Sequence, residues 1–481
     1  MTAIARVRPV YSRLFAEGDA SLGHFLARFS AATLPPLQDR WDYIAEVEAH
    51  AKLSQGEDLA ARVRARLTRS PLVYTANHLC VECMPLTVQS MIVAALGEDP
   101  AEALPVEASA LIPADNASYP VGLMLARRHQ GKPLRVPILD LSNKQKRQMT
   151  LGLDPYGEAD LAQAEVRVRS LLKAGHLGER EAQALHATLD GILRAPDVVG
   201  RPTFREQVTS ATPRLWERWF TPEARRRVPP LAYATFESIR TPLLIRDLED
   251  PGAPLHRLFF DPALRGAVLE ALEGVPCCWT GAGRAGGSAL LWEVTDQRRT
   301  SPLIAEGGNL LTADGRRIPL EPAAILEGLR GGTLVPTSFL SLAVGLVRGL
   351  VQVGGFNQVD YLAAMQLGLS RAMASTGYGA WAARLAQPLP ALLTAGLAGL
   401  LATYAEDPAQ SAGGMEILAH GGLGPHDLDR LSTLSLREAM GLELPGIARM
   451  VLGEQGLREA GLPDGVEWTR LCSERMPSLA V

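Results

Sequence analysis

Cysteine is scarce in this chain, and positive charge is not in excess. Five cysteines among 481 residues are too few, and odd in number, for the disulfide framework of a small secreted protein, so we expect a reducing, cytoplasmic location. The 48 lysines and arginines are outnumbered by 52 aspartates and glutamates, which gives a net charge of -4. This balance provides no general attraction to nucleic acid or to an anionic membrane.

Long hydrophobic runs are missing as well. The N-terminal segment carries Arg6, Arg8 and Arg13 but no apolar core of signal-peptide length. The most apolar run, residues 391–405, is fifteen residues long, whereas crossing a bilayer takes ~20. We therefore expect a buried helix there, no export and no membrane partner.

Common catalytic signatures are absent too. The chain contains no G-x-S-x-G, no Walker lysine motif and no H-E-x-x-H, so serine-hydrolase, P-loop and zincin chemistry have no direct support. The glycines of residues 281–287, GAGRAGG, fit G-x-G-x-x-G literally. They lack the flanking strand and helix that a dinucleotide site requires.

Short apolar runs alternate with helical patterns in the first third of the chain. Residues 71–76 predict a strand and residues 86–97 a helix, and a second unit follows with a strand at 108–114 and a helix at 121–128. Residues 134–141 indicate a third strand. Such alternation is typical of an α/β protein whose parallel sheet is covered by helices on both faces.

The remaining pattern suggests a helical insertion and a return to α/β structure. Residues 158–195 predict a charged helical hairpin, 241–248 a strand, 262–273 a helix, and 313–320 a hairpin turn at Asp-Gly. The expected organisation is a helical lead-in (1–70), the first half of the core (71–155), the hairpin insertion (156–230), the second half of the core (231–370) and a mainly helical C-terminal region (371–481).

Polar side chains cluster where the first predicted strand ends. Asn77 and His78 lie at that end, and Glu82 follows four residues after His78. Ligands of parallel sheets bind at the carboxyl ends of strands, where an imidazole can act as an acid or a base. The alternative is a polar loop that only caps its own helix.

Three further groups have both a functional and an ordinary explanation. Asp115, Asn116 and Ser118 occupy the turn after the second strand, and such residues also stabilise plain turns. Lys144 lies in a basic loop that could meet a phosphate or carboxylate, or simply face solvent. Cys80 and Cys83 have the two-residue gap of zinc ligands, but one pair is half a site and buried free thiols are the alternative.

Two segments resemble bacillithiol synthases. In that family a Thr-Gly-Gln-Gln turn is followed by Pro-Leu and a helix, and here Thr75-Ala76-Asn77-His78 is followed by Pro85-Leu86 at the same spacing. A later family segment runs through an arginine-proline pair to Gly-Gly-Pro-Gly-Glu-Ile-Ala-Tyr, which residues 334–366 resemble at Val353-Gly354-Gly355 and Tyr361. The similarity covers residues 10–140 and 230–370.

The resemblance implies a Rossmann-like core with inserted helical segments and a reaction that joins cysteine to the amine of a glucosamine-malate conjugate. This chain departs from the family at Asn77-His78, which replaces Gln-Gln, and at Gln358, which replaces a glutamate. The arginine-proline pair falls near Ser341-Leu342, and serine cannot make the bidentate pair of arginine with a carboxylate. The substrates are therefore expected to differ.

We predict a ligase-like enzyme of specialised metabolism that forms an amide-type C–N bond between an amino-acid-like donor and an amine or related nucleophile. The expected catalytic residues are His78, Glu82 and Asp115. The expected substrate- or nucleotide-binding residues are Asn77, Asn116, Ser118, Lys144, Gly354, Gly355, Asn357 and Gln358. The two glycines would let backbone N–H groups approach the ligand. Because a free carboxylate must be activated, a nucleotide is the first cofactor to test.

Two alternatives stay open. Leu342 and Leu346, in a stretch where the family is polar, suit a catalytically degenerate binding or scaffold subunit of a biosynthetic complex. A zinc-dependent enzyme would use His78, Cys80 and Cys83. The partners expected are a small molecule and either a second copy of the chain or a biosynthetic partner protein.

Overall fold

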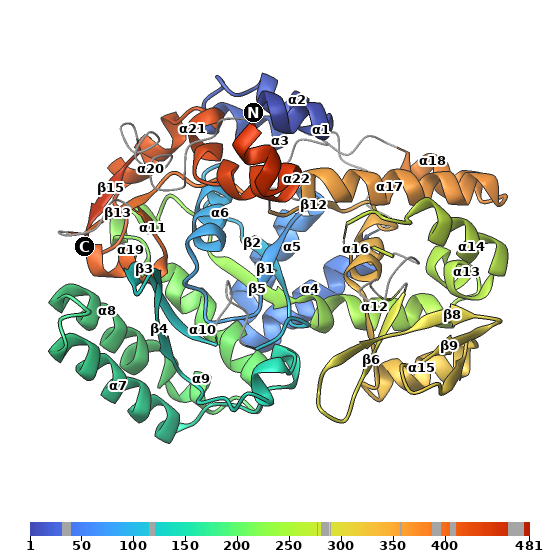
Figure 1. Cartoon of the computed structure of the whole chain (residues 1–481), viewed down its shortest axis with the longest axis horizontal. Helices are drawn as coiled ribbons and strands as arrows, with labels where there is room; N and C mark the ends of the chain where they lie inside the picture. Colours follow the sequence, from blue (N-terminus) through green and yellow to red (C-terminus); the bar gives the residue numbers. More distant parts are fainter. Residues whose placement is uncertain are drawn as a thin grey trace.

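A sheet of four parallel strands lies near the centre of the molecule in the computed structural model (Figure 1). The structure describes residues 1–30, 40–114, 121–276, 278–279, 288, 290–355, 358–386, 396–404, 410–459 and 476–481. The strands are β1 (Leu72–His78), β2 (Leu104–Ser109), β5 (Leu231–Thr235) and β12 (Val351–Val353), in the order β12-β1-β2-β5. The chain moves from β1 through β2 to β5 on one side and returns to β12 on the other. The strand order therefore reverses between β1 and β12.

The two faces of this sheet belong to different hydrophobic cores. Val73 and Ala232 pack into one core with α4 (Trp41–Gln55), α5 (Glu57–Arg69) and α12 (Phe236–Glu249). Their chain neighbours Tyr74 and Tyr233 pack into the other core with α6 (Pro85–Ala95) and α10 (Phe204–Arg218). This follows from the two-residue period of strands, which sends successive side chains to opposite faces.

Smaller sheets and further helices surround the central sheet. The hairpin of β3 (Gly122–His129) and β4 (Lys132–Pro137) packs beside α7 (Glu158–Lys173), α8 (Glu179–Thr188) and α9 (Pro196–Val199). Two three-stranded sheets are built from β6 (Leu291–Val294), β7 (Thr300–Pro302), β8 (Ile304–Glu306), β9 (Asn309–Leu311), β10 (Arg317–Pro319) and β11 (Leu334–Pro336). A third joins β13 (Leu401–Thr403), β14 (Gln410–Ser411) and β15 (Ser478–Ala480).

The remaining helices extend from both ends of the chain. Those of the N-terminal and middle segments are α1 (Thr2–Val7), α2 (Val10–Ala16), α3 (Leu22–Ser30), α11 (Pro222–Arg225), α13 (Pro254–Phe260) and α14 (Pro262–Ala271). Those of the later segments are α15 (Pro322–Arg330), α16 (Ser338–Leu346), α17 (Gln358–Ser375), α18 (Gly379–Leu385), α19 (Gly414–His420), α20 (Pro425–Thr433), α21 (Leu436–Gly441) and α22 (Leu444–Glu459). Within the described residues, no helix combines the length and the apolarity that a membrane crossing demands.

Several element predictions are confirmed and several are wrong. The first strand and helix, the hairpin of α7 and α8, and α14 form where the sequence predicts them. Residues 121–128, predicted as a helix, form β3, and residues 241–248, predicted as a strand, lie inside α12. The run predicted as a third parallel strand pairs antiparallel in the β3–β4 hairpin, and residues 401–403 of the expected buried helix form β13.

Candidate functional site

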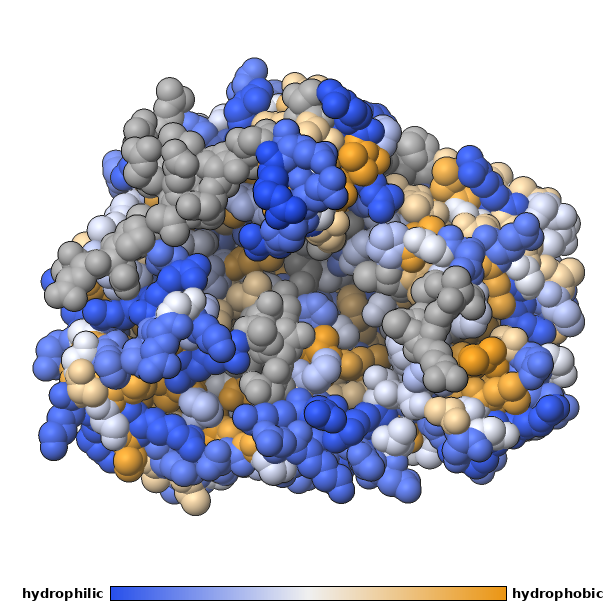
Figure 2. Space-filling model, viewed as in Figure 1, coloured by the Kyte–Doolittle hydropathy of each residue, from blue (hydrophilic) through white to orange (hydrophobic). Residues whose placement is uncertain are grey.

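A cavity of about 490 Å³ lies at the carboxyl ends of the parallel strands. β1 contributes Thr75, Asn77 and His78 to its lining, Ser109 ends β2, and Gly355 belongs to the bend after β12. Figure 2 shows this face of the molecule hollowed near its centre, below α22. Open parallel sheets bind ligands where their strand order reverses, and that point lies between β1 and β12 here.

Besides α22, four helices in the described part of the chain begin beside this cavity. Their first turns supply Leu86 and Thr87 of α6, Phe236 of α12, Ser338 of α16, and Gln358 and Tyr361 of α17. The free N–H groups at a helix N-terminus favour an anion. A further wall comes from α22 and the residue before it, with Glu443, Gly446, Ile447 and Met450.

His78 is the last residue of β1 and lines the cavity. Burial lowers the pKa of its imidazole to about 4, since the charged form would lose solvation. The ring is therefore neutral at pH 7. A neutral imidazole donates from one nitrogen and accepts at the other, so His78 is equipped for hydrogen bonding to a ligand more than for carrying charge.

Glu82 lies behind the cavity wall and positions two residues that line it. Asn77 donates from Nδ2 to Glu82 Oε2 at 3.0 Å, and the Thr87 hydroxyl donates to Oε1. Burial raises the pKa of the fully buried carboxyl group to about 8, although both hydrogen bonds act in the opposite direction. At neutral pH Glu82 is mainly protonated, and it holds Asn77 and Thr87 in place.

Gln358, the first residue of α17, joins this helix to β1 beside the Gly354-Gly355 bend. Gln358 donates from Nε2 to the Thr75 carbonyl oxygen at 3.0 Å and accepts from the Thr75 hydroxyl at 3.0 Å. A Cβ atom on Gly354 would lie 1.7 Å from the Gln358 amide carbon, so this glycine makes room for a side chain of the protein rather than for a ligand. Gly355 has no such neighbour and lines the cavity itself.

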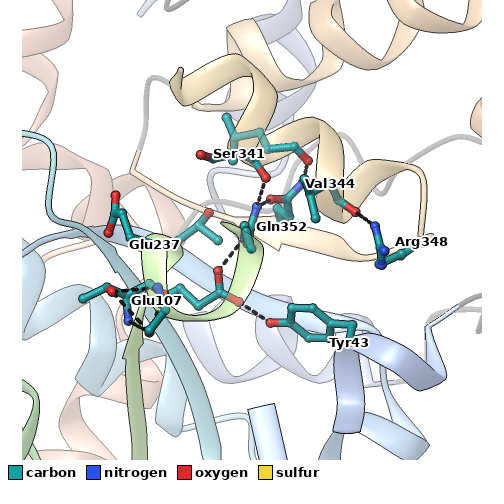
Figure 3. Close-up of polar contacts among 12 residues, drawn as sticks. Tyr43, Glu107, Glu237, Ser341, Val344, Arg348 and Gln352 are labelled. Atoms are coloured by element: carbon teal, nitrogen blue, oxygen red, sulfur yellow. Dashed lines mark hydrogen bonds and ion pairs between the residues drawn. The ribbon is translucent and has the colours of Figure 1, made fainter. Parts of the chain in front are cut away.

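A buried ion pair fixes two of the helices that form the walls. Arg240 of α12, 0 % exposed, donates from Nε to Glu107 of β2 at 2.5 Å and from Nη1 to the Ser341 carbonyl oxygen of α16 at 2.8 Å. Figure 3 shows the surroundings of Glu107, where the Tyr43 hydroxyl donates to the same carboxylate. The Arg240 guanidinium also stacks on the Phe236 ring at 4.4 Å from its centroid. The network ties α12 and α16 to the sheet.

The structure separates one predicted site residue from the others and leaves several undescribed. Lys144 lies in an exposed loop, where its carbonyl oxygen accepts from Arg299 Nη2 at 3.1 Å, and it does not line the cavity. Four predicted residues, Asp115, Asn116, Ser118 and Asn357, fall outside the described residues, as does the GAGRAGG segment. The cavity thus brings together Asn77, His78, Gly355 and Gln358.

Two residues that sequence reasoning missed also line the cavity. Glu443 is half-buried immediately before α22, and burial raises the pKa of its carboxyl group to about 7. Ser90, in the second turn of α6, is 1 % exposed, and its hydroxyl has no hydrogen-bond partner among the described residues. Neither belongs to a motif. Ser90 follows two other polar residues of α6, Thr87 and Gln89, so the helix pattern does not mark it.

The two neighbouring thiols are poorly suited to a metal. Cys80 and Cys83 are buried and free, and burial raises the pKa of both well above the usual range of a thiol. Zinc is bound by thiolates, so protonated thiols are weak ligands. Across the described ranges, His, Cys, Asp and Glu side chains form no group of three or more that could hold a metal ion.

The described lining of the cavity is more apolar than polar and carries little charge. Hydroxyl, amide and imidazole groups alternate with apolar side chains, Glu443 is its one carboxylic acid, and no lysine or arginine contributes to it. Such a lining orients a small ligand by hydrogen bonds. No family model, no curated protein and no solved structure matches this chain.

Proposed function

We propose that this chain is an enzyme of specialised metabolism that resembles bacillithiol synthases and forms a C–N bond between an amino-acid-like donor and an amine or related nucleophile. The observation that carries the proposal is the shared cavity. His78 after β1 and Gly355 after β12 are remote in sequence, yet both line it. These two positions belong to the two segments that resemble the family.

The strand order supports a Rossmann-like core. Numbered along the chain, the four parallel strands lie in the order three, two, one, four. This is the order of the first four strands in a doubly wound dinucleotide-binding sheet, and the cavity lies at its reversal point. In the proposed core, the substrate therefore binds at the point where ligands of doubly wound sheets usually bind.

Different residues of the cavity have different roles in the proposed reaction. The neutral imidazole of His78 donates a hydrogen bond to the carbonyl oxygen of the donor. Asn77 donates from Nδ2 to Glu82 and to Met91 Sδ, so its Oδ1 is the atom that can accept from an N–H group of a substrate. The carboxyl group of Glu443 has a pKa near neutrality, which suits proton exchange with the attacking amine. Without basic side chains in its described lining, the cavity suits a donor that arrives already activated, such as a thioester. Its C–S bond breaks as the C–N bond forms, the thiol leaves, and the proton lost by the amine passes to the thiolate.

The test is a search for condensation products. The purified chain is incubated with amino-acid thioesters and mixtures of amines, and products are identified by mass spectrometry. We expect an amide product whose rate falls about a hundredfold or more in His78→Ala. His24→Ala, exposed on α3, is the matched control and should keep full turnover. A folded His78→Ala protein with unchanged turnover would remove the role assigned to His78.

A second candidate, a catalytically degenerate binding subunit, is favoured by one observation. Leu342 lines the cavity at a place where the family has polar residues, so an apolar wall replaces a polar one. A binding subunit would bind ligands from the same panel, and a partner protein, without forming product from any mixture. Product formation by the chain alone would exclude this candidate.

A further inference from the structure

Glu443 stands out because its carboxylate has no partner among the residues that the structure describes. No described side chain donates a hydrogen bond to it or pairs with it, although it is half-buried in the cavity wall. Its backbone is fixed, since Glu443 N donates to the Met440 carbonyl oxygen at 3.0 Å and its own carbonyl oxygen accepts from Ile447 N at 3.1 Å. Carboxylates withdrawn from water are normally paired, so the group is poised to meet a cation.

A second place in the cavity favours negative charge. The side chain of Met84, the N-cap residue of α6, makes no capping hydrogen bond, and Leu86 and Thr87 of the first turn line the cavity. The Ser90 hydroxyl of the same helix is buried, has no partner within the described part of the chain, and lines the cavity too. An uncapped helix N-terminus and an unused donor both suit a carboxylate.

We infer that the cavity binds a zwitterionic, amino-acid-like ligand, with its ammonium group against Glu443 and its carboxylate at the N-terminal turns of α6 beside Ser90. The inference rests on the cavity of the proposed function and names the class of its amine substrate, because an activated donor has no free carboxylate. It adds α22 to the site, a segment with no counterpart in the family resemblance. Bound ammonium would keep Glu443 ionised, because an opposite charge favours the charged form.

The wild-type protein provides the first test. Each common L-amino acid is titrated into the full chain by calorimetry, beside its des-amino carboxylic acid and its decarboxylated amine. We expect at least one amino acid to bind, and both truncated analogues to bind about tenfold to a hundredfold more weakly, because each loses one charged contact. Equal binding of the des-amino acid, or no binding by any amino acid, overturns the inference.

Variants locate the two contacts. Glu443→Gln keeps the size of the side chain but removes its charge, so binding of the best amino acid should weaken about tenfold or more while binding of its des-amino acid stays unchanged. Ser90→Ala should weaken both. Glu454→Gln is the control, because Glu454 is an exposed residue of α22 that pairs with Arg449 at 2.8 Å. Should Glu443→Gln fail to fold, Glu443→Asp takes its place, and the wild-type analogue series remains decisive.

Failure of this inference differs from failure of the proposed function. Amino-acid binding that depends on Glu443, without product from any mixture, supports the inference and contradicts C–N bond formation. Turnover of a substrate that has no ammonium group, with an unchanged KM in Glu443→Gln, contradicts the inference and keeps the proposed function.

Discussion

Replacing Arg240 should break its buried ion pair with Glu107 and destabilise the helices that form the cavity walls. Arg240→Met keeps the apolar length of the side chain but leaves the Glu107 carboxylate, which is 2 % exposed, with the Tyr43 hydroxyl as its one remaining side-chain partner among the described residues. The Ser341 carbonyl oxygen loses its donor in the same change. Breaking one partner of a buried ion pair costs about 3–5 kcal/mol, which is a large share of the ~5–15 kcal/mol that stabilises a typical domain.

The matched comparison is the double variant Arg240→Met with Glu107→Gln. It removes both charges, so no buried carboxylate is left alone, and we expect at least about 2 kcal/mol of the loss to be recovered. Urea unfolding followed by circular dichroism measures both variants against the wild type. The reasoning is refuted if the single and double variants lose the same free energy of unfolding, or if Arg240→Met loses less than about 1 kcal/mol.

Three shorter predictions follow from the site. The folded chain holds the Glu82 proton more tightly than the unfolded chain does. The free energy of unfolding should therefore fall by up to about 1.4 kcal/mol per pH unit from pH ~4.5 to ~8. Glu82→Gln should flatten this slope in urea titrations. Gly354→Ala should displace the Gln358 side chain, break its two hydrogen bonds to β1, and lower the stability by about 1–3 kcal/mol in thermal unfolding. Purified protein should contain less than about a tenth of an equivalent of zinc by elemental analysis, because Cys80 and Cys83 are protonated thiols.

Each of these predictions has a contrasting outcome. An unchanged pH slope in Glu82→Gln would place the titrating group elsewhere. Gly355→Ala is the control for the glycine variant, since open space surrounds its Cβ position, and an equal loss in both variants would contradict the steric argument. One equivalent of zinc that resists dialysis would restore the metal hypothesis.

Sequence patterns located the central strand and its helix because several signals agree there. Residues 72–78 combine β-branched and aromatic residues before a polar turn, and Pro85 occupies the first position of α6, where proline is favoured. Residues 121–128 were predicted wrongly because a short apolar run fits a buried strand and a helix equally well. Residues 241–248 were predicted as a strand, but a capping box at Thr235 starts α12 and Pro242 lies within this helix.

The candidate site could be predicted only in part from the sequence. Strand ends are predictable positions for ligands, which is why Asn77 and His78 could be placed. Burial is a tertiary property, so no sequence pattern indicates that Glu82 lies behind the cavity wall or that it keeps its proton. Glu443 was missed because it lies far from β1 in the sequence, next to α22, and reaches the cavity only through tertiary packing.

The strand order also determines when the central sheet can be completed during synthesis of the chain. β1 and β2 leave the ribosome early, but β12, which covers the other edge of β1, is made only after the long segment that follows β5. Until then the nascent chain presents an unpaired parallel edge, the kind of surface that recruits other chains. The sheet, and the ligand site with it, can therefore be completed only when the last third of the polypeptide is made. Chaperone protection would matter most before that point.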